Sequence, residues 1–445
     1  MSPAASADPA AAELVEGSGA AGDAPAEAPP VALYVHVPFC VSHCPYCDFV
    51  VVSGREARGP VNRIGAFLDA LEVELELRAA ALDARWGRPG APSAGAEAAS
   101  LPGTHRPVLD SLYLGGGTPS LLPPTAIARL IAVVRHRFGL APDAEVTLEA
   151  NPGPDERGDA GALHEAGVTR LSIGAQSLEA AELRALGRRH TPADVGATVD
   201  AARAAGIHSV SLDLLYDIPG SSLQTWARTL DAALRLEPDH LSLYALTLDD
   251  PDAEGITGSG GDHLPLRPGP RRWRERARPG QDDDRAAAMY EVADLRLAAA
   301  GFAWYEISNW ARPGHRSRHN LAYWQRLTYE AVGPGAHAFD GRTRRWNAAR
   351  LDRYLEALRP TTERSPKLPP GGEERLDGAT AVAESAILAL RTSDGLPAST
   401  PADAWVEERC AEPLRQGLLE RVPDGRLVLT VRGRLLSNEV FGRLL

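Results

Sequence analysis

Residues 34–49 carry three of the four cysteines in the chain, in the order Tyr34-Val-His-Val-Pro-Phe-Cys40-Val-Ser-His-Cys44-Pro-Tyr-Cys47-Asp-Phe49. The cysteines have C-x3-C-x2-C spacing and follow a run with β-strand character. Three soft sulfur ligands in one loop favour an iron–sulfur cluster. A cubane cluster held by three protein ligands keeps one iron open, as reactive metal centres require. The pattern therefore predicts a 4Fe–4S cluster held by Cys40, Cys44 and Cys47.

Other uses of these cysteines fit the sequence less well. A zinc ion would need a fourth ligand from His36, His43 or the remote Cys410, and zinc sites usually contain paired C-x2-C units. Disulfides would leave one of the three cysteines over, and nothing else marks the chain as secreted. Unliganded core thiols are the remaining alternative, and this is the simplest interpretation of Cys410.

The length and the net charge of the chain limit the classes of protein to which it can belong. The 445 residues suffice for two or three domains, and the net charge of −12 argues against a general nucleic-acid binder. No apolar run approaches membrane-spanning length. Residues 1–30 are rich in Ala, Pro, Gly and Glu without Lys or Arg, which predicts a disordered tail rather than a signal or transit peptide. Together with an oxygen-sensitive cluster, these features predict a cytoplasmic protein.

From residue 32 to residue 246, strand and helix patterns alternate. Strands are expected at 32–37, 108–114, 145–149, 170–174, 209–215 and 240–246, with amphipathic helices between them, the first over 62–83. Residues 87–106 are expected to be a disordered surface insertion. Six β/α units are fewer than the eight of a closed barrel. The fold class is therefore α/β, a partial open (β/α)6 barrel.

Polar or glycine-rich features follow the expected strands. They are the cysteine loop, Gly115-Gly-Gly-Thr118, Glu149, Gln176 and Asp213. In parallel β/α folds reacting groups collect at the carboxyl ends of the strands, so these residues are candidates for one site. The glycines also fit a plain tight turn, and Glu149 and Asp213 also fit ordinary helix caps.

The second half of the chain is less regular. We expect a low-complexity insertion at 251–285, whose basic run is either a solvated loop or a docking patch for an acidic partner. A helix is expected at 286–300, and the aromatic-rich stretch 305–324 is expected to be a binding loop. His319, Tyr323 and Trp324 in that stretch could ligate and stack a flat macrocycle, although such a histidine is more often structural.

The sequence pattern of residues 376–445 predicts helices, then a strand and a final helix. This order is typical of a winged-helix-like module. Because its charges nearly balance, we expect it to pack or bind a partner rather than DNA. The predicted organisation is therefore a tail (1–30), a core (31–250), an insertion (251–285), a ligand-side α/β extension (286–375) and the winged-helix-like module (376–445).

The C-x3-C-x2-C loop, with Tyr46 before its last cysteine, resembles that of the radical S-adenosylmethionine (SAM) family. The resemblance implies that the open iron chelates SAM and that the reduced cluster splits SAM into methionine and a 5′-deoxyadenosyl radical. It also implies the partial barrel. Matched to the family pattern, the residues that take SAM-contacting positions are Tyr34, Gly116, Gly117, Thr118, Glu149, Gln176, Arg188 and Asp213. One departure is Asp217, where the family usually has glycine.

Within that family, residues 31–445 resemble the haem chaperones of the HemW type, relatives of the oxygen-independent coproporphyrinogen III oxidases. The oxidase pattern has a further cysteine where this chain has Phe49, and the chaperone pattern has His-Asn-x-x-Tyr-Trp, here His319–Trp324. The resemblance implies haem bound through the His319 region, with His315 and His337 as competing ligands. It also implies delivery to haemoproteins of the respiratory chain, a low-potential electron donor of the flavodoxin or ferredoxin type, and room for transient contact with a membrane surface. The alternative function is the oxidase reaction, radical decarboxylation of coproporphyrinogen III to protoporphyrinogen IX.

Overall fold

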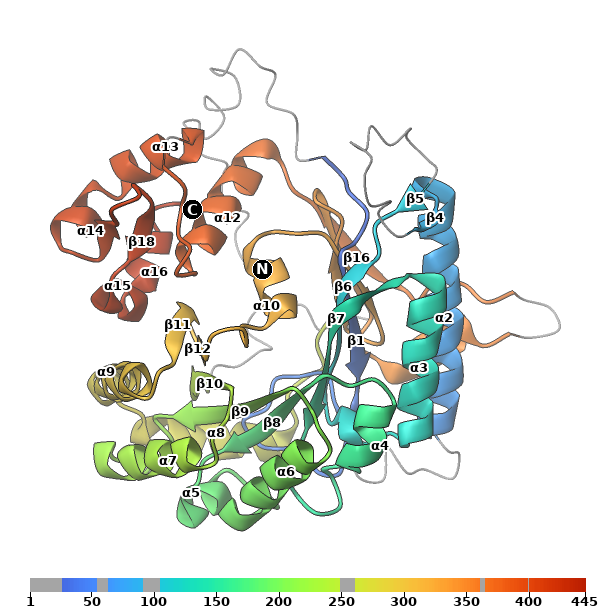
Figure 1. Ribbon diagram of the computed structural model, residues 1–445, viewed down its shortest axis with the longest axis horizontal. Coiled ribbons are helices and arrows are strands. Elements are labelled where there is room, and N and C mark those ends of the chain that lie inside the picture. The colour runs from blue at the N-terminus through green and yellow to red at the C-terminus, as the bar shows by residue number, and fades with distance from the viewer. Residues whose placement is uncertain (1–25, 54–62, 91–104, 249–260, 361–364, 399) are drawn as a thin grey trace.

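A curved sheet of twelve strands organises the chain in the computed structural model, which describes residues 26–53, 63–90, 105–248, 261–360, 365–398 and 400–445 (Figure 1). Its centre is a run of six parallel strands in the spatial order β10-β9-β8-β7-β6-β1. They are β1 (Ala32–Val37), β6 (Leu109–Gly116), β7 (Leu140–Ala150), β8 (Arg170–Gln176), β9 (Ser209–Tyr216) and β10 (His240–Ala245). This confirms the predicted fold class, a partial open barrel.

Helices cover the outer face of these strands (Figure 1). They are α2 (Arg63–Trp86), α3 (Pro124–Arg137), α4 (Ala160–Glu165), α5 (Ala180–Ala185), α6 (Pro192–Ala204) and α7 (Leu223–Arg235). Alternate strand residues such as Val35, Leu114 and Leu212 point toward the helices and form the main core. Side chains on the other face are largely polar. Period-two alternation thus turns one face of the sheet toward the core and the other toward a polar interior.

The extension completes both edges of this sheet. Beside β1 lie the parallel strand β13 (Tyr329–Val332) and the antiparallel strands β14 (His337–Phe339), β15 (Thr343–Asn347) and β16 (Gly371–Arg375). On the other edge, β12 (Asn309–Ala311) pairs antiparallel with β10, and β11 (Ala303–Glu306) pairs antiparallel with β12. The sequence predicted an α/β extension here but gave no indication that it would continue the barrel sheet at both ends.

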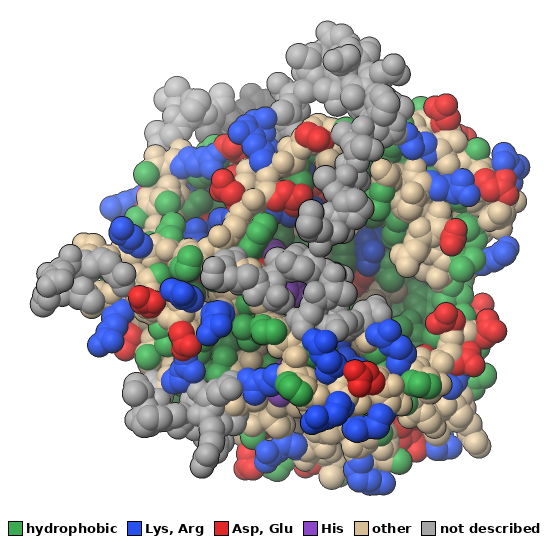
Figure 2. Space-filling view, turned by 180° about the vertical axis from the view of Figure 1, so that it is seen from behind, with side chains coloured by type: hydrophobic (Ala, Val, Ile, Leu, Met, Phe, Trp, Pro, Cys, Tyr) green, Lys and Arg blue, Asp and Glu red, His purple; other side chains and the backbone are tan. Residues whose placement is uncertain are grey.

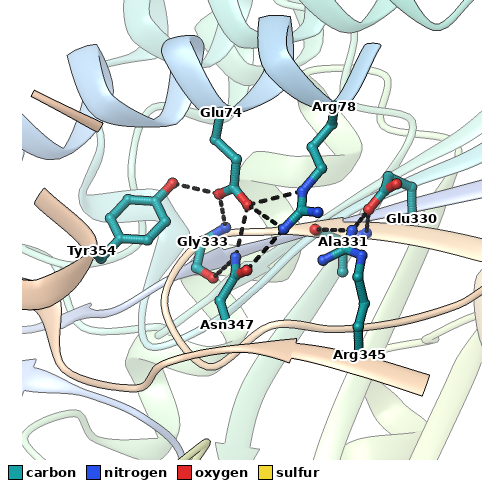
Figure 3. A network of polar contacts seen from close by, with 8 residues as sticks. All are labelled: Glu74, Arg78, Glu330, Ala331, Gly333, Arg345, Asn347 and Tyr354. Carbon is teal, nitrogen blue, oxygen red and sulfur yellow. Dashed lines mark hydrogen bonds and ion pairs between the residues drawn. The ribbon is translucent and has the colours of Figure 1, made fainter. Parts of the chain in front are cut away.

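A buried carboxylate fastens the extension to the core (Figure 3). Glu74 of α2 accepts hydrogen bonds from Arg78, from the amide of Gly333 at 2.9 Å and from Asn347 and Tyr354 at 2.8 Å each. The helix α11 (Leu351–Leu358) supplies Tyr354. Because a buried charge is tolerated only when it is fully hydrogen bonded, this network holds α2, β15, α11 and the Gly333 loop in one arrangement.

The predicted insertion is more ordered than expected over its described part. Residues 268–285 form α8 (Pro268–Ala277), the short 3-10 turn η4 (Arg278–Gly280) and the start of α9 (Asp283–Ala299). The basic run is therefore a helix rather than a loop, although Arg271, Arg272 and Arg276 are exposed as expected. Arg274 is the exception, because it is almost fully buried and donates to the carbonyl oxygen of Pro45 at 3.2 Å. Residues 249–260 lie outside the described residues.

The predicted tail and first insertion fall mainly outside the described residues, at 1–25 and 91–104. Residues 26–30 differ from the expectation of disorder, because the amide of Ala28 donates to Asp340 and Thr328 donates to the carbonyl oxygen of Pro29. The insertion predicted at 87–106 is ordered at its two ends, where β4 (Arg88–Pro89) pairs with β5 (His105–Arg106). Two further short strands, β2 (Phe39–Cys40) and β3 (Val52–Ser53), pair across the cysteine loop.

The stretch 305–324 is not the loop that the sequence suggested. Its parts are the end of β11, β12 and the helix α10 (Arg318–Trp324), which begins at the cap Ser317. The carboxylate of Glu145 accepts from the amides of Arg318 and His319, so α10 lies against the polar inner face of the sheet. Helix formation here follows from the cap and from charge at the helix N-terminus.

The last residues form a small module of helices and a two-stranded wing with its own core. Its elements are α12 (Gly378–Leu390), α13 (Pro401–Arg409), α14 (Ala411–Arg415), β17 (Leu419–Arg421), β18 (Leu427–Leu429), α15 (Val431–Leu435) and α16 (Ser437–Phe441). Cys410 is fully buried there, as predicted. Acidic and basic side chains are interspersed on the molecular face in Figure 2. No helix in the described part of the chain is long and apolar enough to span a membrane.

Asp217, the departure from the family's glycine, offers a stability test. Its φ is +55°, a left-handed conformation that costs a non-glycine residue about 1 kcal/mol, and its buried carboxylate pairs with Arg285. We expect Asp217→Ala to lower the free energy of unfolding by about 3 kcal/mol, because it keeps the backbone strain and leaves Arg285 unpaired. Asp217→Gly should cost about 1 kcal/mol less than Asp217→Ala, since glycine accepts this φ. Urea denaturation measures both, and equal losses would contradict the strain.

Candidate functional site

A cavity of about 410 Å³ lies inside the barrel at the carboxyl ends of the parallel strands, and we call it the barrel cavity. The predicted site residues that line it are Cys40, Cys44, Cys47, Gly116, Gly117, Glu149, Gln176, Arg188 and Asp213. They come from five strands and the loops that follow. The strand ends therefore bring these residues together around one cavity.

Two side chains donate to the cysteine sulfurs. The Thr118 hydroxyl lies 3.5 Å from Sγ of Cys40, and Nη1 of Arg188 lies 3.4 Å from Sγ of Cys44. Burial raises the pKa of Cys40 to about 11 and that of Cys47 to about 12. Buried thiols of this kind become thiolates when a metal binds them, because metal coordination displaces the proton.

The same side chains form a frame behind the cysteine loop. Nη2 of Arg188 donates to Oδ1 of Asn151 at 2.6 Å and to the carbonyl oxygen of Gly174 at 2.8 Å. Nδ2 of Asn151 in turn donates to Thr118 at 2.9 Å. Asn151 was not among the residues predicted from the sequence, although it lies only two residues after Glu149. Because Asn151 joins the two groups that contact sulfur, it fixes their spacing.

Two carboxylates face the cavity from the inner sheet face, Glu149 on β7 and Asp213 on β9, with β8 between them. Glu149 accepts from the Tyr113 hydroxyl at 2.8 Å and from the amide of Gly116 at 2.9 Å, and burial raises its pKa to about 7. Asp213 accepts from Ser172 at about 3.0 Å, and burial raises its pKa as well. Neither carboxylate acts as a helix cap. Both retain acceptor capacity toward the cavity.

Gln176 and Gly117 show how closely the backbone is constrained here. Gln176 has a φ of +66°, a strained conformation that clusters at functional sites. A Cβ on Gly117 would lie 2.6 Å from the carbonyl oxygen of Phe39. The sequence predicted that the backbone of the glycine segment approaches a ligand closely. At Gly117 the group that lies close to the backbone is instead the start of the cysteine loop.

Some predicted residues do not line the barrel cavity. Thr118 lies behind Cys40, as described above. Tyr34 shares the inner face of the sheet, but its hydroxyl is bonded to Nδ1 of His36 at 3.0 Å. Nε2 of His36 is bonded to the carbonyl oxygen of Val50 at 2.8 Å. Tyr34 therefore acts, through His36, on the far end of the cysteine loop.

His319 is 1% exposed and lies beneath the barrel cavity rather than in its wall. Its Nδ1 is 2.9 Å from the Ser111 hydroxyl, and its Nε2 is 2.8 Å from the hydroxyl of Tyr323, one helical turn along α10. Burial lowers its pKa to about 3. Trp324 packs under the guanidinium of Arg391. In this arrangement both ring nitrogens of His319 are occupied, so the structure gives no support to its predicted role as haem ligand.

Helix α8 contributes a residue that the sequence analysis missed. Arg274 donates to Pro45, between two cluster cysteines, and pairs with Asp48, just after the third. The nearby ring of Trp273 lies against Tyr46, with 6.4 Å between centroids. Proline at the start of this segment was the available helix signal, and the low complexity around it obscured that signal.

The donors present fit a cluster and a polar ligand. Among the described residues no group of three His, Cys, Asp or Glu side chains is close enough to hold a single metal ion. The three cysteines instead line one wall, which suits the separate corners of a cubane better than one zinc ion. Two buried polar atoms in the cavity wall, Nε of Arg188 and Oγ1 of Thr147, have no hydrogen-bond partner in the structure. Such atoms normally have a partner, so they indicate a bound polar group.

The cluster assignment is tested by single substitutions. We expect Cys40→Ala, Cys44→Ala and Cys47→Ala each to abolish a stable 4Fe–4S cluster, because each removes one thiolate. The matched control is Cys410→Ala, in the C-terminal module. Iron and sulfide content and visible absorption after anaerobic reconstitution give the measurement. A full cluster in any of the three variants, or its loss in the control, would contradict the assignment.

The raised pKa of Glu149 predicts a pH dependence of stability. The folded state binds the proton up to about pH 7, whereas the unfolded chain releases it near pH 4.5. Stability from this group is therefore full below about pH 4.5 and is lost as the pH rises toward 7, by on the order of 3 kcal/mol. We expect Glu149→Gln to remove that part of the decline in protein free of cofactors. Chemical denaturation from pH 5 to 8 measures it, and identical slopes for both proteins would refute the assignment.

Comparisons with known proteins agree with this geometry. The Radical SAM superfamily matches residues 34–233. The chain is 40% identical over 424 residues to "Heme chaperone HemW" of Mycobacterium tuberculosis H37Rv, covering 95% of this chain and 97% of that protein. It is 35% identical to "Heme chaperone HemW" of Escherichia coli K12, covering 74% of this chain and 78% of that protein. The solved structure of coproporphyrinogen III oxidase (HemN) from Escherichia coli, a radical SAM enzyme, matches with a TM-score of 0.72 at 22% identity, over 95% of this chain and 91% of that one. The chain therefore belongs to the HemW family of the radical SAM superfamily.

Proposed function

We propose that this protein is a haem chaperone, which binds haem and delivers it to acceptor haemoproteins. The observation that carries the proposal is the 40% identity to a HemW protein along 95% of the chain. A match of this extent includes the barrel, the extension and the C-terminal module together. The similarity to the oxidase structure, at 22% identity, shows only that the two proteins have the same fold.

Membership of the radical SAM superfamily brings two cofactors, a 4Fe–4S cluster and SAM. We propose that Cys40, Cys44 and Cys47 hold the cluster, with Thr118 and Arg188 as the donors that orient and stabilise the thiolates. When bound, the reduced cluster supplies an electron for cleavage of SAM. The contribution of the chain is to place the ligand at the cluster and to exclude water from it.

The barrel cavity has the charge pattern that a zwitterionic ligand requires. Its wall contains the carboxylates of Glu149 and Asp213 together with the guanidinium groups of Arg170 and Arg188. We infer that the carboxylates accept from the amino and hydroxyl groups of SAM, while Arg188 donates to an acceptor on it. Its volume of about 410 Å³ is near the lower end of small-molecule sites, which suits one ligand of this size.

The oxidase function is the second candidate, and two observations weigh against it. Phe49 occupies the position of the additional cysteine in the oxidase pattern, and it is exposed rather than packed into the barrel. The barrel cavity is also small for a porphyrinogen together with SAM. Decarboxylation would need both inside one barrel, within reach of the cluster.

The partners and location are proposals as well. We propose that the acceptors are respiratory haemoproteins, that a flavodoxin- or ferredoxin-type protein reduces the cluster, and that the chaperone works in the cytoplasm and touches the membrane surface transiently at handover.

The function is tested with anaerobically reconstituted protein. We expect saturable one-to-one haem binding in a Soret titration, followed by transfer of the haem to an apo-haemoprotein with recovery of its activity. Free haem at equal concentration is the control for unassisted uptake. Formation of protoporphyrinogen IX from coproporphyrinogen III under reducing conditions with SAM would instead favour the oxidase, and absence of specific haem binding would overturn the chaperone.

A further inference from the structure

Haem needs a site of its own, outside the barrel cavity. That cavity, of about 410 Å³, is assigned to SAM, so haem bound there would have to displace SAM. His319, the motif histidine, is buried with both ring nitrogens hydrogen bonded. A ligand as large as haem could reach that ring only if α10 moved away from Glu145, which accepts from the amides of Arg318 and His319.

A second cavity of about 430 Å³ lies on the other side of the cysteine loop, and we call it the loop cavity. His43, Cys47 and Phe49 line both cavities, so the loop forms the wall between them. The remaining walls come from residues 264–267 and from the starts of α2 and α11. A ligand bound here would lie beside the cluster loop without displacing SAM.

The loop cavity presents an exposed aromatic ring and apolar walls. Phe49 is 64% exposed, although a phenylalanine would normally be buried. Leu264, Leu266 and Leu351 also line the cavity. Aromatic rings and leucines of this kind favour a flat, largely apolar ligand, because covering them removes apolar surface from water.

Cationic groups stand at the rim of the same cavity. Arg267 and Arg350 line it, and both of its acids are already engaged with arginines, Asp48 with Arg274 and Asp352 with Arg63. Arg350 is exposed at the start of α11. An amphipathic ligand with carboxylates at one edge matches this arrangement, since arginine binds carboxylates with paired hydrogen bonds.

The cavity also contains a histidine with capacity to bind a metal. The ring of His43 makes one long contact, from Nε2 to the carbonyl oxygen of Cys47 at 3.4 Å. This contact leaves Nδ1 available among the described residues. Imidazole nitrogen is a usual axial ligand of haem iron.

We propose that the loop cavity is the haem site. The macrocycle packs on Phe49, its carboxylates face Arg350 and Arg267, and its iron faces His43. The inference rests on the proposed function, which supplies haem as the cargo. It also gives a role to Phe49, the residue that separates this chain from the oxidase pattern: at that position an aromatic platform replaces a thiol.

The test is a set of Soret titrations on anaerobically reconstituted full-length protein. We expect Phe49→Ser to raise the Kd for haem about tenfold or more, while the matched control Leu295→Ser, at another exposed apolar residue, leaves it unchanged. Arg350→Glu should raise the Kd about tenfold at low salt, with a smaller effect at high salt, whereas Arg353→Glu on the same helix should not. His43→Gln should shift the Soret maximum of the bound haem.

Two further measurements separate the carboxylate contacts from the aromatic contact, and a lost haem site from a lost cluster. Haem dimethyl ester lacks free carboxylates, so its affinity should be insensitive to Arg350→Glu and still sensitive to Phe49→Ser. Iron and sulfide content of each variant must equal that of the unsubstituted protein, which shows that a lost haem site is not a lost cluster.

The outcomes distinguish the site from the function. If the unsubstituted protein binds haem one to one but the Phe49 and Arg350 variants bind as tightly as their controls, the loop cavity is overturned and the chaperone stands. The same holds if His319→Gln removes binding while the Phe49 variant retains it. If the unsubstituted protein binds no haem specifically, the proposed function fails, and this site fails with it.

Discussion

The cysteine loop has little regular structure of its own, so contacts from the rest of the chain must fix its shape. Thr118 and Arg188 donate to its sulfurs, His36 binds the carbonyl oxygen of Val50 and Arg274 binds that of Pro45. These groups come from the end of β1, from the segments that follow β6 and α5, and from α8. Thr118, His36 and Arg274 are buried, so leaving them without their partners would be unfavourable. The barrel, the extension and α8 can therefore be understood as a frame around this loop.

The sequence was sufficient for those features that depend on local pattern. Strand–helix alternation predicted the parallel sheet, and polar residues after each strand predicted most of the barrel cavity, including Glu149 and Asp213. Ser172 and Asn151 could have been found too, because they share the alternation or the loop of a selected residue. The polar inner face was visible as a period-two pattern in the strands.

Features that depend on distant partners were not predictable in this way. The pairing of β13 with β1 and the packing of α8 on the cysteine loop join segments more than two hundred residues apart. His319 shows the same limit. Its motif is readable, but only the fold shows that Ser111 and Tyr323 occupy its two nitrogens, and that His43 and Phe49 line a second cavity as well as the first. Composition also misled at α8, where a helix lies within a low-complexity segment.

The strand order has a consequence for the newly made protein. Val35 pairs with Val332, so β1 gains its outer neighbour only after nearly 300 further residues have been made. At a translation rate of about 5–20 residues per second, this interval is roughly 15–60 s. During it the cysteine loop, which follows β1, has left the ribosome while that strand still lacks one neighbour, because long-range pairings form late. The nascent chain therefore passes through a period in which its thiols depend on the reducing power of the cell rather than on the fold.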